Sequence, residues 1–100
     1  MLFVRKLIWD TWNIQHIRRH HIVPDEVEAV CHSDSVVLRG QQKGRLVVIG
    51  TTEEERLLGV VLEAKGHGRY YPITAYEADS HDTELYHRLR GGDNNGTEKK

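Results

Sequence analysis

The residues between positions 45 and 76 include arginine, tyrosine and glutamate side chains that could do chemistry together. These side chains are Arg45, Arg56, Glu63, Arg69, Tyr70, Tyr71 and Tyr76. Such residue types suit cleavage of RNA without a metal ion: one group accepts the proton of a 2′-hydroxyl, cations stabilise the phosphate charge, and an acid protonates the leaving oxygen. Solubilising arginines and half-buried tyrosines at sheet edges give the same pattern, and residue types alone favour that structural interpretation.

Two candidates for the proton-transfer group are Glu63 and His20. Arg45 begins one expected strand and Glu63 lies near the end of the next, so a hairpin would bring them together. The pair fits either a catalytic site or a plain cross-strand ion pair, and residue types favour the ion pair. His20 lies on a helix face that looks buried, where an imidazole would only hold a backbone group.

Metal binding is the alternative use of the histidines. His16 and His20 stand one helical turn apart and His21 follows, but zinc needs further ligands, which Cys31 or His32 would have to supply. The spacing lacks the established zinc motifs, and the sequence contains no phosphate-binding loop or dinucleotide fingerprint. We therefore expect no metal and no cofactor, and we interpret Cys31 as a small core residue.

The length and composition favour a single folded domain. A chain of 100 residues with 38% hydrophobic and 29% charged residues supports one core. We assign residues 1–90 to this domain and expect residues 91–100, which hold no apolar side chain, to be a disordered tail. The longest apolar stretches, residues 46–50 and 57–62, are too short for a membrane helix. With its single cysteine and no signal-peptide pattern at its start, the chain is expected to be cytoplasmic.

The periodicity of the apolar residues predicts an α+β fold. A first strand is followed by a helix capped by Asp10, with His20 on its apolar face, and by a second helix opened by Pro24 and buried through Val27, Val30 and Cys31. Short connections between the later strands predict an antiparallel meander. One C-terminal helix with a thin apolar stripe of Ala78, Leu85 and Leu89 is expected to close it. The strands are expected over residues 2–9, 35–39, 45–51, 56–64 and 69–75, and the last helix over residues 77–90.

Residues 46–49 are apolar on both faces of their expected strand. Such a strand needs cover on each side, so we expect a second chain, either another copy or a partner protein, to cover part of the sheet or its helices. Residues 5–22 carry four Arg or Lys residues against one Asp, a local excess that permits a nucleic-acid partner without demanding one.

Five motifs, in order over about residues 3–90, resemble the BrnT family of toxins. They are Trp9-Asp-x-x-Asn13-x-x-His16-Ile17-x-Arg19-His20, Pro24-x-Glu26-Val27, Gly44-Arg45-Leu46-x-x-Ile49-Gly50, Arg56-Leu57-Leu58 and Ile73-Thr74-Ala75. The resemblance implies a RelE-like α+β toxin that cleaves RNA without a metal and is neutralised by a small antitoxin. It also aligns Arg19-His20 with the family's Lys-His pair, and Arg45 and Arg56 with basic strand positions.

The sequence departs from the family pattern at three positions. Tyr76 and Tyr71 stand where many members have arginine, and His21 replaces a common glycine. Tyrosine can donate a hydrogen bond but cannot neutralise a phosphate.

Two hypotheses follow. In the first, the chain is the toxin of a type II toxin–antitoxin pair and a metal-independent endoribonuclease acting on mRNA. Arg45 and Arg56 would then stabilise phosphate, Glu63 or His20 would transfer the proton, and other residues would contact RNA, namely Arg19, Tyr71 and Tyr76. In the second, the chain is a non-catalytic relative that retains a protein- or RNA-binding surface, a hypothesis that Tyr76 favours.

Overall fold

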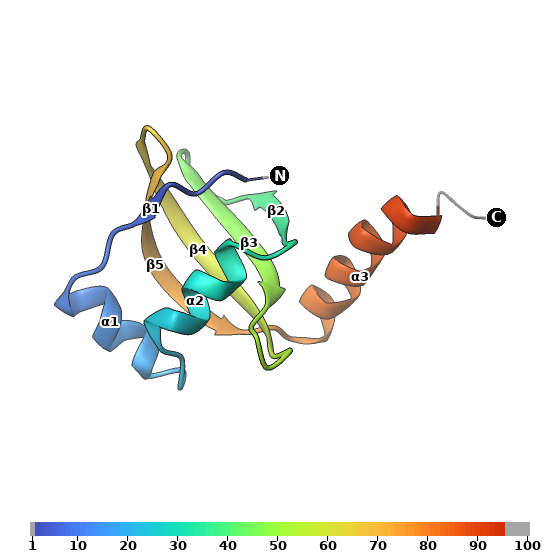
Figure 1. Cartoon of the computed structure of the whole chain (residues 1–100), viewed down its shortest axis with the longest axis horizontal. Coiled ribbons are helices and arrows are strands. Elements are labelled where there is room, and N and C mark those ends of the chain that lie inside the picture. Colours follow the sequence, from blue (N-terminus) through green and yellow to red (C-terminus); the bar gives the residue numbers. More distant parts are fainter. Residues whose placement is uncertain (1, 96–100) are drawn as a thin grey trace.

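The computed structural model describes the backbone of residues 2–95 and the side chains of residues 2–90. Two helices lie on one face of a five-stranded sheet, and a third helix extends from the other side (Figure 1). The elements in chain order are β1 (Lys6–Leu7), α1 (Thr11–Arg18), α2 (Pro24–Cys31), β2 (Val36–Arg39), β3 (Arg45–Thr51), β4 (Leu57–Gly66), β5 (Arg69–Glu77) and α3 (Ser80–Asn95). The α+β class expected from the sequence is confirmed.

The sheet has the strand order β1-β5-β4-β3-β2 and is mixed. Strands β2 to β5 form the expected antiparallel meander, but β1 pairs parallel to β5, with Lys6 opposite Arg69. The prediction of a wholly antiparallel sheet was therefore wrong at this edge, and the first strand is much shorter than residues 2–9. Hairpin connections fix the direction of consecutive strands only, whereas β1 and β5 are separated in sequence by the two helices and the other three strands.

Helix α1 begins as the sequence predicts. The Asp10 carboxylate accepts the Asn13 backbone N–H at 2.9 Å, and the buried Asn13 amide donates to the carbonyl oxygens of Ile8 (3.0 Å) and Pro72 (3.1 Å). The helix ends at Arg18, before His20, and His21 adopts a φ of 61°. Because this turn carries the chain out of the helix, His20 is exposed, and its expected place on a buried face was wrong.

Helix α2 supplies the main core. As predicted, it begins at Pro24 and buries Val27, Val30 and Cys31 against the inner face of the sheet. The sheet residues that complete this core are Val48, Leu58, Val60, Leu62 and Ala75. Burial, assisted by the nearby Glu28 charge, raises the pKa of the Cys31 thiol to about 12, so the thiol stays protonated.

The outer face of the sheet is covered in part by the chain itself. Helix α3 packs mainly against β2 and β3, where Tyr86 is buried with Val36 and Ile49. The expected stripe was wrong at Leu89, which is 40% exposed. Part of the second cover expected for residues 46–49 therefore comes from α3, while no helix among residues 2–95 covers β4 and β5 in this way.

Helix α3 runs to Asn95, beyond the predicted end at Arg90, and residues 96–100 of the predicted tail lie outside the described residues. None of the helices in the described part of the chain is long and apolar enough to cross a membrane.

Candidate functional site

Arg45, Glu63 and Tyr71 lie side by side on three adjacent strands. Arg45 on β3 is registered opposite Glu63 on β4, which is registered opposite Tyr71 on β5. Leu62 points into the core and is fully buried, so the alternation of β4 turns Glu63 to the outer face, away from α1 and α2. Arg45 Nε lies 4.0 Å from Glu63 Oε2, and both side chains are about one-third exposed, 31% and 34%. The predicted adjacency of Arg45 and Glu63 is confirmed.

Lys65 joins this row, although the sequence analysis did not single it out. Its Nζ lies 3.0 Å from Glu63 Oε1 and 6.0 Å from the centre of the Tyr71 ring. Its position two residues after Glu63 on the same strand, and hence on the same face, is the signal that could have found it. The hydrogen bond and charge of Lys65 lower the pKa of Glu63, which is therefore an ionised acceptor at neutral pH.

Tyr71 is held by the residue that caps α1. Its hydroxyl donates to the Asp10 carboxylate, with distances of 3.0 and 3.1 Å to the two oxygens. Desolvation and the Asp10 hydrogen bond raise the pKa of Tyr71, so the phenol remains a proton carrier at neutral pH. Arg45, Glu63, Lys65 and Tyr71, which we call the hairpin-end cluster, thus combine two cations, a carboxylate and a protonated phenol.

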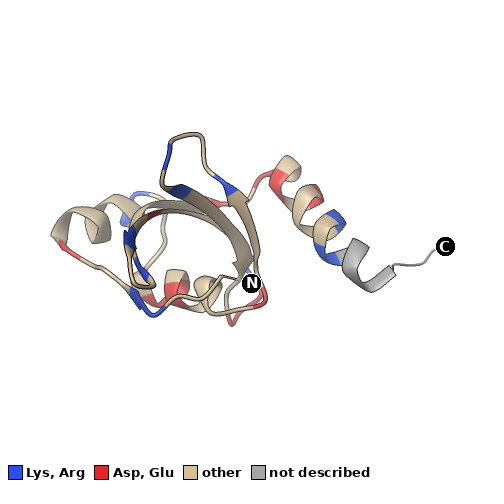
Figure 2. Ribbon diagram, turned by 90° about the horizontal axis from the view of Figure 1, so that it is seen from above, with Lys and Arg blue, Asp and Glu red and all other residues tan. Residues whose placement is uncertain are grey.

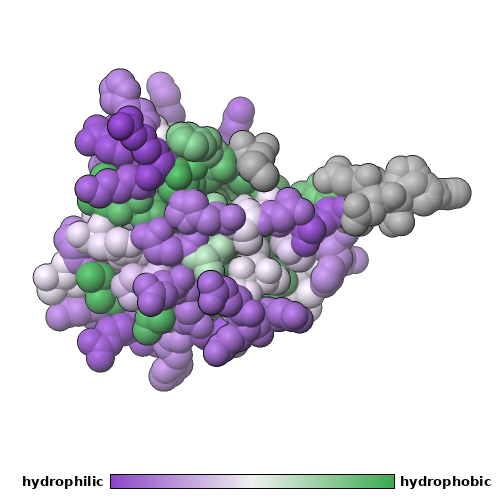
Figure 3. Space-filling view, viewed as in Figure 1, coloured by the Kyte–Doolittle hydropathy of each residue, from purple (hydrophilic) through white to green (hydrophobic). Residues whose placement is uncertain are grey.

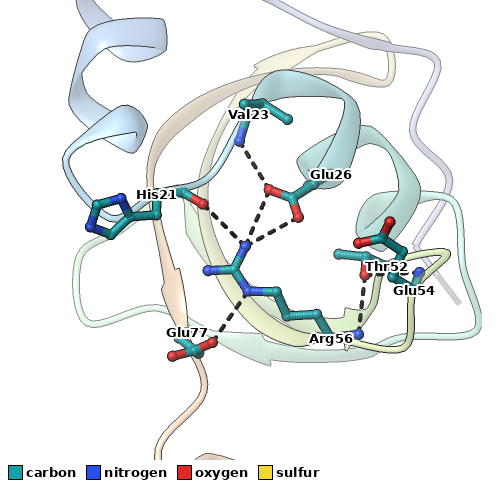
Figure 4. Close-up of polar contacts among 7 residues, drawn as sticks. All are labelled: His21, Val23, Glu26, Thr52, Glu54, Arg56 and Glu77. Atoms are coloured by element: carbon teal, nitrogen blue, oxygen red, sulfur yellow. Dashed lines mark hydrogen bonds and ion pairs between the residues drawn. The ribbon is translucent and has the colours of Figure 1, made fainter.

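Arg56 belongs to a different part of the molecule (Figure 4). Its guanidinium contacts Glu26 Oε2 at 3.1 Å, Glu77 Oε2 at 3.2 Å and the His21 carbonyl oxygen at 3.1 Å. It precedes β4, while Glu63 follows seven residues later, about 23 Å along an extended strand. The structure therefore does not bring Arg56 together with Arg45, and its contacts favour a structural role.

Arg19 and His20 also lie away from the hairpin-end cluster. They follow α1 directly before His21, whose carbonyl oxygen Arg56 binds, and both side chains are exposed. The His20 ring lies 6.1 Å from the His16 ring, which itself stacks on Trp12 at 4.8 Å.

The surroundings of Arg56 are acidic. A hollow of about 700 Å³ between α2 and the β3–β4 turn has five carboxylates in its lining, from Asp25, Glu26, Glu28, Glu53 and Glu54. A polyanion would be repelled there. The opposite end of the sheet, which holds the β4–β5 turn and which we call the hairpin end, is therefore the better place for a phosphate ligand.

Tyr76 covers the middle of the outer face, where it is registered opposite Gly59. Desolvation, together with the charges of Asp82 and Asp79, raises its pKa. Gly59 lies four residues before Glu63, about 13 Å along β4, so Tyr76 is not part of the hairpin-end cluster. Within the part of the chain that the structure describes, no group of three or more His, Cys, Asp or Glu residues is arranged to hold a metal ion.

Comparison with solved structures identifies the fold. The chain superposes on the crystal structure of the Brucella abortus ribonuclease toxin BrnT with a TM-score of 0.62 and 23% sequence identity, covering 75% of this chain and 97% of that one. The chain has the BrnT fold. No protein-family model and no curated protein matches the sequence. The resemblance noted in the sequence is thus confirmed at the level of the fold, and the hairpin-end cluster lies on the outer sheet face of a BrnT fold.

Proposed function

We propose that this chain is the toxin of a type II toxin–antitoxin pair, a metal-independent endoribonuclease that cleaves mRNA in the cytoplasm. The observation that carries the proposal is the hairpin-end cluster, which places a carboxylate, two cations and a phenol on one exposed row of the sheet. The likeness of the fold to a ribonuclease toxin supports the same conclusion.

The roles follow from the chemistry of RNA cleavage. Glu63 accepts the proton of the 2′-hydroxyl, whose oxygen attacks the adjacent phosphorus. Arg45 and Lys65 stabilise the negative charge that develops on the phosphate oxygens. Tyr71 protonates the 5′-oxygen as the bond between phosphorus and that oxygen breaks, leaving a 2′,3′-cyclic phosphate and a 5′-hydroxyl. The reaction transfers protons and exchanges one P–O bond for another, so it needs no redox partner or cofactor.

A second candidate is a non-catalytic RNA-binding module with the same fold. The Lys65 contact favours it, because the lowered pKa of Glu63 makes this carboxylate a weak base. Tyr76, which stands where the resembled family has arginine, also favours it.

The proposed partner is a cognate antitoxin. The β4–β5 part of the outer face lacks the helical cover that α3 gives to β2 and β3, and it carries half-buried apolar residues such as Val61. An antitoxin segment on this face would complete the cover expected for a strand that is apolar on both sides. Association of two copies of this chain is the other way to cover it.

Induced expression in a bacterial growth assay tests the toxin proposal. We expect wild-type protein to arrest growth and to leave cleaved mRNA, and we expect Arg45→Ala to abolish both effects. Arg88→Ala on α3 is the matched control and retains them, because this exposed arginine lies outside the hairpin-end cluster. Growth arrest by a folded Arg45→Ala variant, or RNA that remains intact with wild-type protein, would contradict the proposal.

A further inference from the structure

Three arginine or lysine side chains and one histidine line a hollow at the edge of the sheet beside the hairpin-end cluster. The hollow measures about 450 Å³, and its lining residues are Arg5, Lys6, His67 and Arg69. They come from β1 and the residue before it, from the β4–β5 turn and from the start of β5, segments that the parallel β1–β5 pairing brings together. We call these four residues the basic cradle.

The backbone fixes the geometry of the basic cradle. The backbone N–H groups of Arg5 and Lys6 donate to the Gly68 carbonyl oxygen at 2.8 and 3.3 Å. The Arg69 guanidinium donates to the carbonyl oxygens of Gly66 (3.3 Å) and Lys65 (3.4 Å). The turn itself needs left-handed conformations, with φ of 90° at Gly66, 60° at His67 and 76° at Gly68. The backbone of the basic cradle and the Arg69 guanidinium are therefore held in place by the fold before any ligand arrives.

The charge of the basic cradle is not neutralised. Among residues 2–90, every salt bridge is made by other side chains, and none engages these four. Lys and Arg positions gather at the hairpin end of the sheet, onto which Figure 2 looks. Such a concentration of positive charge attracts a phosphate-bearing polymer.

An exposed aromatic ring lies next to these cations. Phe3 is 74% exposed, and its Cδ2 lies 3.6 Å from the point where a Cβ on Gly68 would stand. In Figure 3 a hydrophobic patch over the N-terminal segment adjoins the hydrophilic hairpin end. A cationic groove beside an exposed ring is the arrangement with which proteins bind single-stranded nucleic acid, because phosphates meet the cations and a base stacks on the ring.

The basic cradle is continuous with the hairpin-end cluster. Arg69 lies two residues before Tyr71 on β5, about 7 Å along the strand and on the same outer face. Lys6 is registered beside Arg69, and its neighbour Leu7 is buried in the core, so alternation turns Lys6 to that face as well. An RNA strand bound in the cradle would therefore lie close to Tyr71.

We propose that the basic cradle and Phe3 form a second subsite for single-stranded RNA, which binds a phosphodiester between the cations and stacks one base on Phe3. The proposal rests on the proposed function for the identity of the polymer. It goes beyond that function by assigning three cations, a histidine and an aromatic ring to substrate binding outside the hairpin-end cluster.

Fluorescence anisotropy with a labelled 12-nucleotide oligouridine tests the subsite, using Glu63→Gln protein so that the probe is not cut. Lys6→Gln with Arg69→Gln should weaken binding at least 10-fold. It should also reduce the slope of log affinity against log salt by about 1.4, since each phosphate contact on a single strand contributes about 0.7. Arg18→Gln with Arg88→Gln removes the same charge elsewhere on the surface and should leave the slope unchanged.

Phe3 is tested in the same assay. Phe3→Ala should weaken binding by about 5-fold or more with the salt slope unchanged, and Phe3→Trp should restore it, because stacking involves no counterion release. Oligothymidine of the same length should bind through the same residues, since the cradle and Phe3 contact groups common to both polymers. An acidic peptide serves as the competing ligand. If the Lys6→Gln, Arg69→Gln variant loses affinity for this peptide but not for oligouridine, the ligand is a protein and the proposal is overturned.

The result that would overturn the subsite is an equal salt slope for the cradle and control pairs, or unchanged affinity of Phe3→Ala. Melting curves identify any variant that fails to fold, and Lys6→Gln alone then carries the test with an expected slope change of about 0.7. RNA cleavage by the wild-type protein is scored separately. Cleavage with an unchanged slope overturns the subsite only, whereas a reduced slope without cleavage overturns the ribonuclease only.

Discussion

The ring of Tyr76 lies directly over Gly59 on the neighbouring strand. A Cβ added to Gly59 would stand 2.5 Å from Tyr76 Cζ and 2.7 Å from its hydroxyl oxygen. The glycine therefore belongs to the packing of the outer sheet face: it makes room for a tyrosine ring that covers β4 where α3 does not.

Gly59→Ala should destabilise the protein by about 1–3 kcal/mol, because the added methyl group forces the Tyr76 ring off the strand. Alanine is otherwise better than glycine in a strand by roughly 0.5–1 kcal/mol. In a Tyr76→Ala background the same substitution should therefore be neutral or stabilising. Urea unfolding of the four proteins in this cycle measures the coupling. Equal effects of Gly59→Ala in both backgrounds would show that the ring does not occupy this space.

Tyr76→Arg introduces the residue that the resembled family has at this position. We expect no gain in RNA cleavage, because position 76 lies about 13 Å along the sheet from Glu63. We also expect lower stability, because a charged chain replaces a half-buried ring. Cleavage rates and melting temperatures of the purified variant check both expectations. A clear rise in cleavage would move Tyr76 into the phosphate-binding surface.

Contacts between neighbouring parts of the chain could be predicted from the sequence. The contact of Arg45 with Glu63 was predictable, because a short polar turn and strict alternation fix the register of consecutive strands. The burial of Val27, Val30 and Cys31 followed from helical spacing in the same way. Both features depend on residues that are close in sequence.

Contacts between distant segments could not be read from local patterns. Arg56 contacts Glu26, which is thirty residues away. Nothing local in the sequence distinguished Arg56 from Arg45 as a candidate for binding phosphate. The parallel pairing of β1 with β5 and the basic cradle that it creates carry no periodic signal either. His20 was misplaced because the helix ends at Arg18, and a helical wheel drawn past that end has no meaning.

Arg56→Ala should lower stability rather than remove activity. It deprives Glu26 and Glu77 of their shared cation and the His21 carbonyl oxygen of its donor. The cost should be about 1–2 kcal/mol, since the group is only partly exposed. Arg88→Ala, at an exposed arginine that makes none of the ion pairs among residues 2–90, is the control and should cost less. Chemical denaturation measures both, and loss of RNA cleavage by a fully folded Arg56→Ala protein would return Arg56 to the site.

Cys31 should be unreactive in the folded protein. Its thiol is buried, and burial raises its pKa from 9.0 to about 12, so a disulfide reagent at pH 8 should react only after the protein unfolds. In the unfolded chain the thiol loses its proton above pH 9.0, whereas the folded thiol keeps it to about 12. The protonated thiol therefore contributes stability that is fully present below pH 9.0 and is lost as the pH rises from 9.0 to about 12. Rapid labelling of native protein would contradict the buried placement, and Cys31→Ala should flatten this part of the pH profile.

The central claim is that the hairpin-end cluster cleaves RNA. Its most direct test is incubation of purified protein with a defined mRNA fragment in the presence of a chelator, with the product ends identified. We predict fragments that end in 2′,3′-cyclic phosphate and 5′-hydroxyl groups, and a loss of about 100-fold or more in rate for Arg45→Ala at unchanged melting temperature. Intact RNA with wild-type protein, or equal rates for wild type and Arg45→Ala, would contradict it.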